Sequence, residues 1–147
     1  MLQEFVEDAQ DIDEVSTEAL QGEFYKYWIF RHILRSPEGH NYNMLIKDGK
    51  VISVDHEWSF DSDPPDPSYF DIDRNYYGVK APDSLIAILK KYLGDDLKQE
   101  TLKSALSGVI SSRDVNITME RLKTFGNLLV TKGQVDSKEE LSGENLW

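Results

Sequence analysis

Three polar residues whose types suit metal and phosphate chemistry, His40, Asn43 and Asp55, flank one predicted β-hairpin. The hairpin is predicted from Asp48-Gly49, which separates two short apolar runs. Both turn positions of such a hairpin need a positive φ, and Asp-Gly tolerates it. The two strands then run side by side, so Asn43, just before the first strand, comes close to Asp55, just after the second. The predicted register pairs Lys47 with Lys50, Ile46 with Val51, Leu45 with Ile52 and Met44 with Ser53.

An Asn and an Asp at the same end of a hairpin are suitable ligands for Mg²⁺. This ion prefers oxygen atoms, binds through one or two side chains together with substrate phosphates, and keeps several water molecules. The short loop from His40 to Asn43 adds an imidazole beside the two oxygen ligands. A purely structural role is the alternative, because Asn and Asp often satisfy backbone groups at the end of a turn or strand. The sequence alone leaves both interpretations open.

The same stretch resembles the catalytic segment of the phosphatidylinositol kinase-like and HipA-like kinases. These enzymes carry a loop of the form Asp-Arg-His-x-x-Asn, then an apolar strand, a turn, and a strand that ends in Ile-Asp. The resemblance extends over most of the chain, but only this central motif is specific. The matching run is Glu38-Gly39-His40-Asn41-Tyr42-Asn43, followed by Met44-Leu45-Ile46, the Asp48-Gly49 turn and Val54-Asp55.

The resemblance implies a role for each matched residue. Asn43 and Asp55 would be the Mg²⁺ ligands, with ATP as the nucleotide, because in kinases such an Asn and Asp hold metal ions that bridge the phosphates. His40 would help to order the loop or the transferred phosphoryl group. Glu38 stands where the family has its catalytic Asp, and Gly39 stands where the family has an Arg. Glu38 keeps the carboxylate but moves it about one methylene outward, and an error near 1 Å can cost roughly 100-fold in rate.

The segment before the motif lacks the parts that cover a nucleotide in a complete kinase, a Gly-rich loop and a strand Lys. Residues 1–37 contain no Gly-x-Gly-x-x-Gly and no Gly-Lys-Ser/Thr, and Lys26 falls in a predicted helix. We therefore expect a C-terminal lobe without its N-terminal lobe. One interpretation is an ATP-dependent phosphotransferase whose N-lobe is supplied by a partner chain. The other is a catalytically degenerate interaction module that binds a partner protein.

Composition favours one acidic domain. The chain has 147 residues, a formal net charge of −11 and no Cys. Its charge argues against binding the phosphate backbone of nucleic acid or an anionic membrane, and no apolar run is long enough for a membrane span. The absence of Cys is compatible with a reducing cytoplasm, which is the expected location. We expect a single domain over residues 1–135 and a flexible tail over 136–147. Leu141 is an apolar residue of this tail that is suited to packing against the domain.

Apolar spacing predicts a mostly helical α+β fold around the hairpin. A helix over about 16–35 is apolar around most of its girth, so it should be central, with Trp28 buried and His32 a core residue rather than a ligand. Acidic residues 7–14 are predicted to be a solvated connector. Three further helices are expected to pack together as core. They run from Pro82 to Gly94, from Asp95 or Asp96 to about Val109, and from Ser112 to near Gly133.

Overall fold

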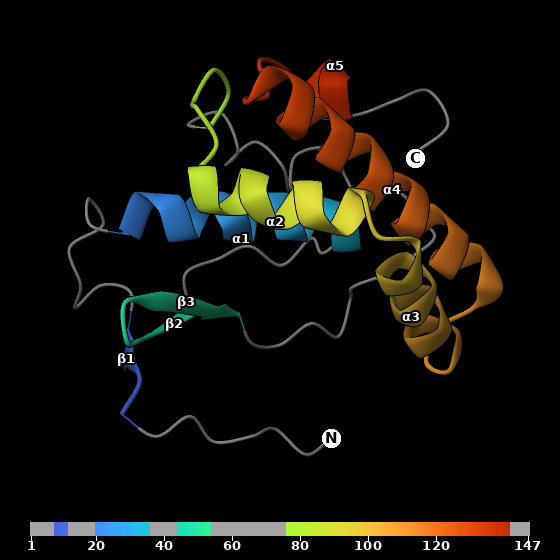
Figure 1. Cartoon of the computed structure of the whole chain (residues 1–147). Helices are drawn as coiled ribbons and strands as arrows, with labels where there is room; N and C mark the ends of the chain where they lie inside the picture. The colour runs from blue at the N-terminus through green and yellow to red at the C-terminus, as the bar shows by residue number, and fades with distance from the viewer. Residues whose placement is uncertain (1–7, 12–19, 36–43, 54–75, 142–147) are drawn as a thin grey trace.

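The computed structural model describes residues 8–11, 20–35, 44–53 and 76–141 (Figure 1). Over these residues the chain is a mostly helical α+β domain, with five helices and a small antiparallel sheet. None of the helices in these ranges is long and apolar enough to cross a membrane. The elements are β1 (Gln10–Asp11), α1 (Gln21–Leu34), β2 (Met44–Lys47), β3 (Lys50–Ser53), α2 (Asp83–Leu93), α3 (Asp96–Ser107), α4 (Ser112–Lys132) and α5 (Lys138–Leu141).

The predicted hairpin is confirmed in its position and its register. β2 and β3 are antiparallel, and all the expected pairs form, from Lys47 with Lys50 at the turn to Met44 with Ser53 at the open end. Asp48 and Gly49 have φ values of 51° and 71°. These positive angles are the reason that Asp-Gly, rather than a bulkier pair, occupies the turn.

β1 corrects the expectation that residues 7–14 form only a solvated connector. Gln10 pairs with Ile46 and Asp11 with Leu45, so β2 becomes the central strand of a sheet in the order β1-β2-β3. A strand of two polar residues has too few side chains to show an alternating pattern. Its pairing depends on the free edge that β2 offers, which no local signal in this acidic segment reveals.

α1 is the central helix of the domain, as its apolar sequence predicts. Two core clusters lie against it, and one of them joins it to the hairpin through Phe24, Tyr27, Met44 and Ile46. The other joins it to α2, α4 and the segment after α4. Trp28 belongs to this second cluster and is 2% exposed, which confirms its predicted burial. The expected start of the helix, 16–19, lies outside the described residues. The buried members of the second cluster are Tyr25, Trp28, Ile29, Ile33, Ala81, Leu89, Phe125, Leu129, Val135 and Leu141.

The ends of the C-terminal helices agree with the predicted capping residues. Pro82 precedes α2 and Gly94 follows it. The side chain of Asp95 accepts a hydrogen bond from the Lys98 amide at 3.1 Å and so caps the start of α3. Gly133 ends α4 with a φ of 81°, a conformation that favours glycine.

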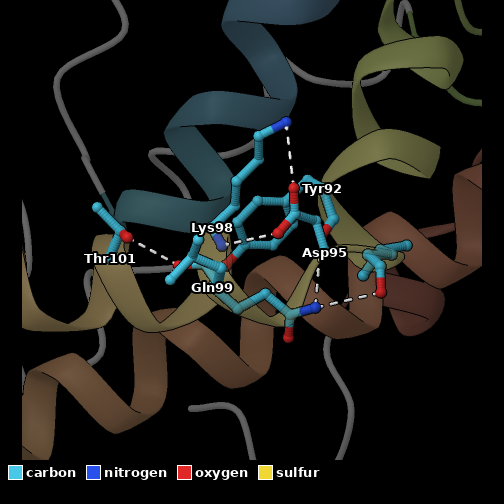
Figure 2. Close-up of polar contacts among 7 residues, drawn as sticks. Tyr92, Asp95, Lys98, Gln99 and Thr101 are labelled. Carbon is cyan, nitrogen blue, oxygen red and sulfur yellow. Dashed lines mark hydrogen bonds and ion pairs between the residues drawn. The ribbon is translucent and has the colours of Figure 1, made fainter.

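Figure 2 shows how the short connection between α2 and α3 is closed. The Gln99 side-chain amide donates to the backbone oxygens of Tyr92 and Leu93, at 3.3 and 3.1 Å. These carbonyls belong to the last turn of α2, where the regular helical hydrogen bonds end. The Tyr92 carbonyl also accepts the Asp95 N–H at 3.1 Å. The second helix therefore caps the end of the first and fixes the angle between the two.

α3 departs from the expectation that all three C-terminal helices form core. None of its residues is fully buried. Leu97 at its start is 77% exposed, and Val109 just after its end is 82% exposed. The reason lies in the packing of its neighbours, because α2 and α4 already cover each other. A Cβ added to Gly126 of α4 would lie only 3.2 Å from the Leu93 side chain of α2. α3 is left at the outside of this pair (Figure 1).

The start of the expected tail belongs to the folded domain. Residues 138–141 form α5, and Leu141 has no exposed surface. Just before it, the Gly78 N–H donates to the Val135 carbonyl at 2.7 Å and the Ala81 N–H to the Gly133 carbonyl at 2.8 Å. These bonds tie the segment after α4 to the one before α2. Residues 142–147 lie outside the described part of the chain.

Candidate functional site

The four residues predicted to carry chemistry, Glu38, His40, Asn43 and Asp55, all lie outside the described residues. The structure does describe the ends of the elements from which their segments depart. One is the C-terminal end of α1, and the other is the open end of the β2–β3 hairpin. The candidate site is therefore built from these two ends.

The open end of the hairpin has the geometry from which the metal pair was predicted. Met44 and Ser53 are partners across the ladder. In an antiparallel pair, residues opposite each other have Cα atoms about 4.5 to 5.5 Å apart. Met44 is 7% exposed and packs toward α1, so this end is anchored on the central helix. Two chain segments thus leave one fixed point, one toward Asn43 and one toward Asp55.

The two faces of the hairpin differ in character. Met44 and Ile46 face α1, whereas Leu45, on the opposite face of the same strand, is only half-buried. Leu45 is paired with Ile52, which is also half-buried. The outer face therefore carries two adjacent aliphatic side chains beside the open end, an arrangement suited to contact with a flat apolar group.

A cluster of buried basic residues lies at the C-terminal end of α1. Its members are three arginines and one histidine, and none is more than 3% exposed. Three come from the last turn of α1 and its cap, where the negative end of the helix dipole favours positive charge. The fourth reaches in from α4. The cluster consists of Arg31, His32, Arg35 and Arg121.

Arg121 makes the contact that joins α4 to the end of α1. Its Nη1 donates to the backbone oxygen of His32 at 2.8 Å, and the side chain has no exposed surface. Burial, together with the smaller effect of the nearby charge of Arg35, lowers the pKa of Arg121 to about 9. Burial of guanidinium groups is costly unless they are hydrogen-bonded and balanced by negative charge.

Arg35 has an unusual backbone. It caps α1 in the left-handed region with a φ of 54°, and its N–H bonds to the carbonyls of Arg31 and His32. That conformation costs a residue other than glycine about 1 to 2 kcal/mol. Arg35 directly precedes, in the sequence, the segment that contains Glu38 and His40.

Sequence reasoning missed the arginine cluster, although a signal was present. Arg121 interrupts the stripe of buried positions along α4 at helical spacing, with Thr118 one turn before it and Phe125 one turn after it. Arg31 likewise lies on the buried side of α1, one turn after Tyr27. A charged residue on a buried stripe indicates a paired or functional position, because burial without a partner is unfavourable.

His32 has the structural role predicted for it. It is 2% exposed, and its ring lies almost perpendicular to those of Trp28 and Phe125. The distances between ring centroids are 5.5 and 6.4 Å. Its surroundings are thus aromatic. In the part of the chain that the structure describes, no group of three or more His, Cys, Asp or Glu residues could hold a metal ion.

A concave surface lies between α1, α2 and β3. It is a mostly apolar groove of about 440 Å³, and the ion pair between Lys26 and Glu23, at 2.6 Å, belongs to its lining. Phe30 contributes a ring that is 43% exposed. The lining is otherwise apolar or aromatic. Its lining residues are Glu23, Lys26, Tyr27, Ile29, Phe30, Ile33, Val51, Leu85 and Leu89.

Comparisons of the chain with protein-family models, with curated proteins and with solved structures find no match.

Proposed function

We propose that this domain binds a Mg²⁺–nucleotide complex beside the open end of the hairpin and is an ATP-dependent phosphotransferase of kinase-like type. In this proposal it corresponds to the C-terminal lobe of a phosphatidylinositol kinase-like or HipA-like kinase. The observation that carries the proposal is the β2–β3 register, in which Met44 faces Ser53. That pairing is the one the motif requires if Asn43 and Asp55 are to serve one metal ion.

Each residue of the motif has a part in the proposed site. Asn43 and Asp55 would hold Mg²⁺, which would offset the negative charge of the nucleotide phosphates. Glu38 would orient the acceptor group and take up its proton. His40 would order the loop between α1 and β2. The Leu45–Ile52 pair on the outer face of the hairpin offers the nucleobase an apolar floor.

A second candidate function is a non-catalytic interaction module. Two observations favour it. Glu38-Gly39 departs from the Asp-Arg of the family, and the apolar groove between α1, α2 and β3 exposes Phe30 in a way suited to a protein partner. In this case the motif would be a remnant and nucleotide would not bind.

Thermal unfolding with ADP and Mg²⁺ distinguishes the two functions. A ligand that binds only the folded state stabilises it by about 2.7 kcal/mol at 100 times its dissociation constant. We expect an increase in melting temperature that requires the metal and disappears with EDTA. Asn43→Ala and Asp55→Ala should each abolish the increase. Asp83→Ala, which removes an exposed carboxylate at the start of α2, is the matched control and should retain it.

The opposite results are equally informative. An increase that survives both Asn43→Ala and Asp55→Ala would put the nucleotide elsewhere on the domain. No increase at millimolar nucleotide would leave the interaction module as the better proposal.

A further inference from the structure

β3 is an edge strand in the part of the chain that the structure describes. The sheet order is β1-β2-β3, so β3 has β2 on one side and no described strand on the other. A free edge presents main-chain N–H and C=O groups with which a further strand can pair. Proline or a bulge would block such an edge, but the register of β3 is continuous and its sequence contains no proline. This edge can therefore accept a neighbouring strand.

The main-chain groups of Val51 and Ser53 point toward the free edge. The two-residue turn closes the hairpin at Lys47 and Lys50, and the pair that flanks such a turn exchanges hydrogen bonds. Hydrogen-bonded and non-hydrogen-bonded pairs then alternate along an antiparallel ladder. Ile52 is therefore bonded to β2, whereas the N–H and C=O groups of Val51 and Ser53 face the other way.

The apolar groove lies beside the same edge. Of the described residues that line it, Val51 alone comes from the sheet, and the others come from α1 and α2. Its volume of about 440 Å³ is within the range of specific binding sites, about 300 to 1,000 Å³. A strand added to β3 would lie about 4.8 Å from it. The side chains of that strand that share the face of Val51 would enter the groove.

The elements that border the groove, α1, α2 and the hairpin, carry more lysines than carboxylates. Complementary charge speeds association and disfavours partners of the wrong sign, so an acidic partner suits this surface. The lysines are Lys26, Lys47, Lys50, Lys90 and Lys91, and the carboxylates are Glu23, Asp48 and Asp83.

We propose that the edge of β3 and the groove form one site for an extended, acidic segment of a partner protein. The segment adds to the sheet beside β3 and antiparallel to it, because antiparallel pairing is slightly more stable per residue than parallel pairing. Its main chain pairs with Val51 and Ser53, and its apolar side chains, at alternate positions, fill the groove. This site is independent of the proposed nucleotide site, and it identifies the kind of partner that the second candidate function needs.

The test uses the synthetic peptide acetyl-Glu-Val-Glu-Ile-Glu-Val-Glu-amide and the full-length protein without nucleotide. Calorimetry gives the dissociation constant. In antiparallel pairing, the residues whose side chains enter the groove also direct their N–H groups to β3. N-methylation of the apolar residues should therefore raise the dissociation constant at least tenfold, because it removes those hydrogen bonds. N-methylation of the glutamates between them should change it less than twofold. The reverse pattern, or no binding of the parent peptide at millimolar concentration, would overturn the proposal.

Amide hydrogen exchange shows where the peptide binds. With saturating peptide, the Val51 and Ser53 amides should exchange at least ten times more slowly, relative to those of Lys50 and Ile52, which are bonded to β2 in both states. Binding without this protection would refute strand addition. Protection of Val51 and Ser53 already in the free protein would show that the chain itself occupies the edge, which would also overturn the proposal.

Two substitutions of exposed apolar residues separate the groove from the rest of the surface. Phe30→Ser removes a ring that is 43% exposed from the lining and should raise the dissociation constant at least tenfold. Leu97→Ser, at a residue of α3 that is 77% exposed, is the matched control and should change it less than twofold. Circular dichroism establishes that both variants fold. Equal effects of the two substitutions would show that the peptide binds apolar surface without selectivity, and would refute the proposed site.

Discussion

The indole of Trp28 stacks on the ring of Tyr76, with centroids 5.1 Å apart and planes inclined by 19°. Trp28 lies in the middle of α1, and Tyr76 begins the segment that leads into α2. Tyr76 packs against both core clusters. This one contact therefore joins the central helix, the hairpin side and the C-terminal helices.

Loss of the Tyr76 ring should destabilise the whole domain. Aromatic pairs contribute about 0.5 to 1.5 kcal/mol beyond the area they bury. We expect Tyr76→Leu to lower the free energy of unfolding by at least that amount more than Tyr76→Phe, which keeps the stacked ring. Urea denaturation followed by Trp fluorescence measures both. Equal losses in the two variants would show that the hydroxyl, rather than the stack, stabilises this position.

Two positive charges lie side by side next to the turn of the hairpin, and a substitution can reverse one of them. Lys47 and Lys50 are directly opposite each other beside the turn, and opposite charges at such positions contribute about 0.2 to 1 kcal/mol. Lys50→Glu should therefore stabilise the protein, less so at high salt. Lys103→Glu on exposed α3 makes the same change in net charge and serves as the control. A gain of equal size in the control would exclude a cross-strand origin.

The hairpin and the ends of the C-terminal helices were predictable because local signals determine them. Asp48-Gly49 fixes both the turn and the register, and capping residues such as Asp95 and Gly133 mark helix ends within one or two positions. Such signals act over a few residues, so they need no knowledge of the rest of the fold. The same register is the basis for proposing that Asn43 and Asp55 share one metal ion, and the four site residues stay predictions.

Contacts between distant segments were not predictable. β1 forms because β2 offers an edge, and the burial of Leu141 depends on the core cluster of α1, α2 and α4. Arg121 belongs to the same class, because the carbonyl that accepts its hydrogen bond comes from another helix. The spacing of Arg121 along α4 is a signal of its burial, but only the fold reveals its hydrogen-bond partner.

Tyr25 should make the protein less stable in alkaline solution. It is 2% exposed, and burial raises the pKa of its hydroxyl to about 12, against an opposing contribution from the Val135 backbone. The pKa of an unfolded tyrosine is about 10. Between these values the unfolded chain loses the proton and the folded chain keeps it. The stability due to this group is therefore complete below pH 10 and is lost as the pH rises toward 12.

The comparison with Tyr25→Phe isolates this effect, since all other titrating groups are shared. Wild type should lose about 1.4 kcal/mol relative to the variant between pH 9 and pH 11, equivalent to one unit of pKa difference. Urea denaturation at each pH gives the two free energies of unfolding. Parallel curves for the two proteins would mean that the hydroxyl ionises as readily in the folded state as in the unfolded one.

Substitutions of Glu38 test the enzyme proposal. If its carboxylate accepts the proton of the acceptor group, slow ATP hydrolysis or phosphoryl transfer should be detectable. This activity should fall in Glu38→Gln, which keeps the shape of the side chain but removes the proton acceptor. Glu38→Asp should raise the rate if the extra methylene misplaces the carboxylate, because alignment rather than pKa then limits the reaction.

The control for Glu38 is nucleotide binding, which separates catalysis from affinity. Glu38→Gln should leave the Mg²⁺-dependent increase in melting temperature in place, because in the proposed site the metal is held by Asn43 and Asp55 and not by Glu38. Activity assays should be made on the domain alone and with a separate N-lobe added. If wild type, Glu38→Gln and Glu38→Asp are equally inactive under both conditions while nucleotide still binds, the enzyme proposal fails. The domain would then bind nucleotide without catalysing its transfer, and the groove between α1, α2 and β3 would be the first surface to test for a protein partner.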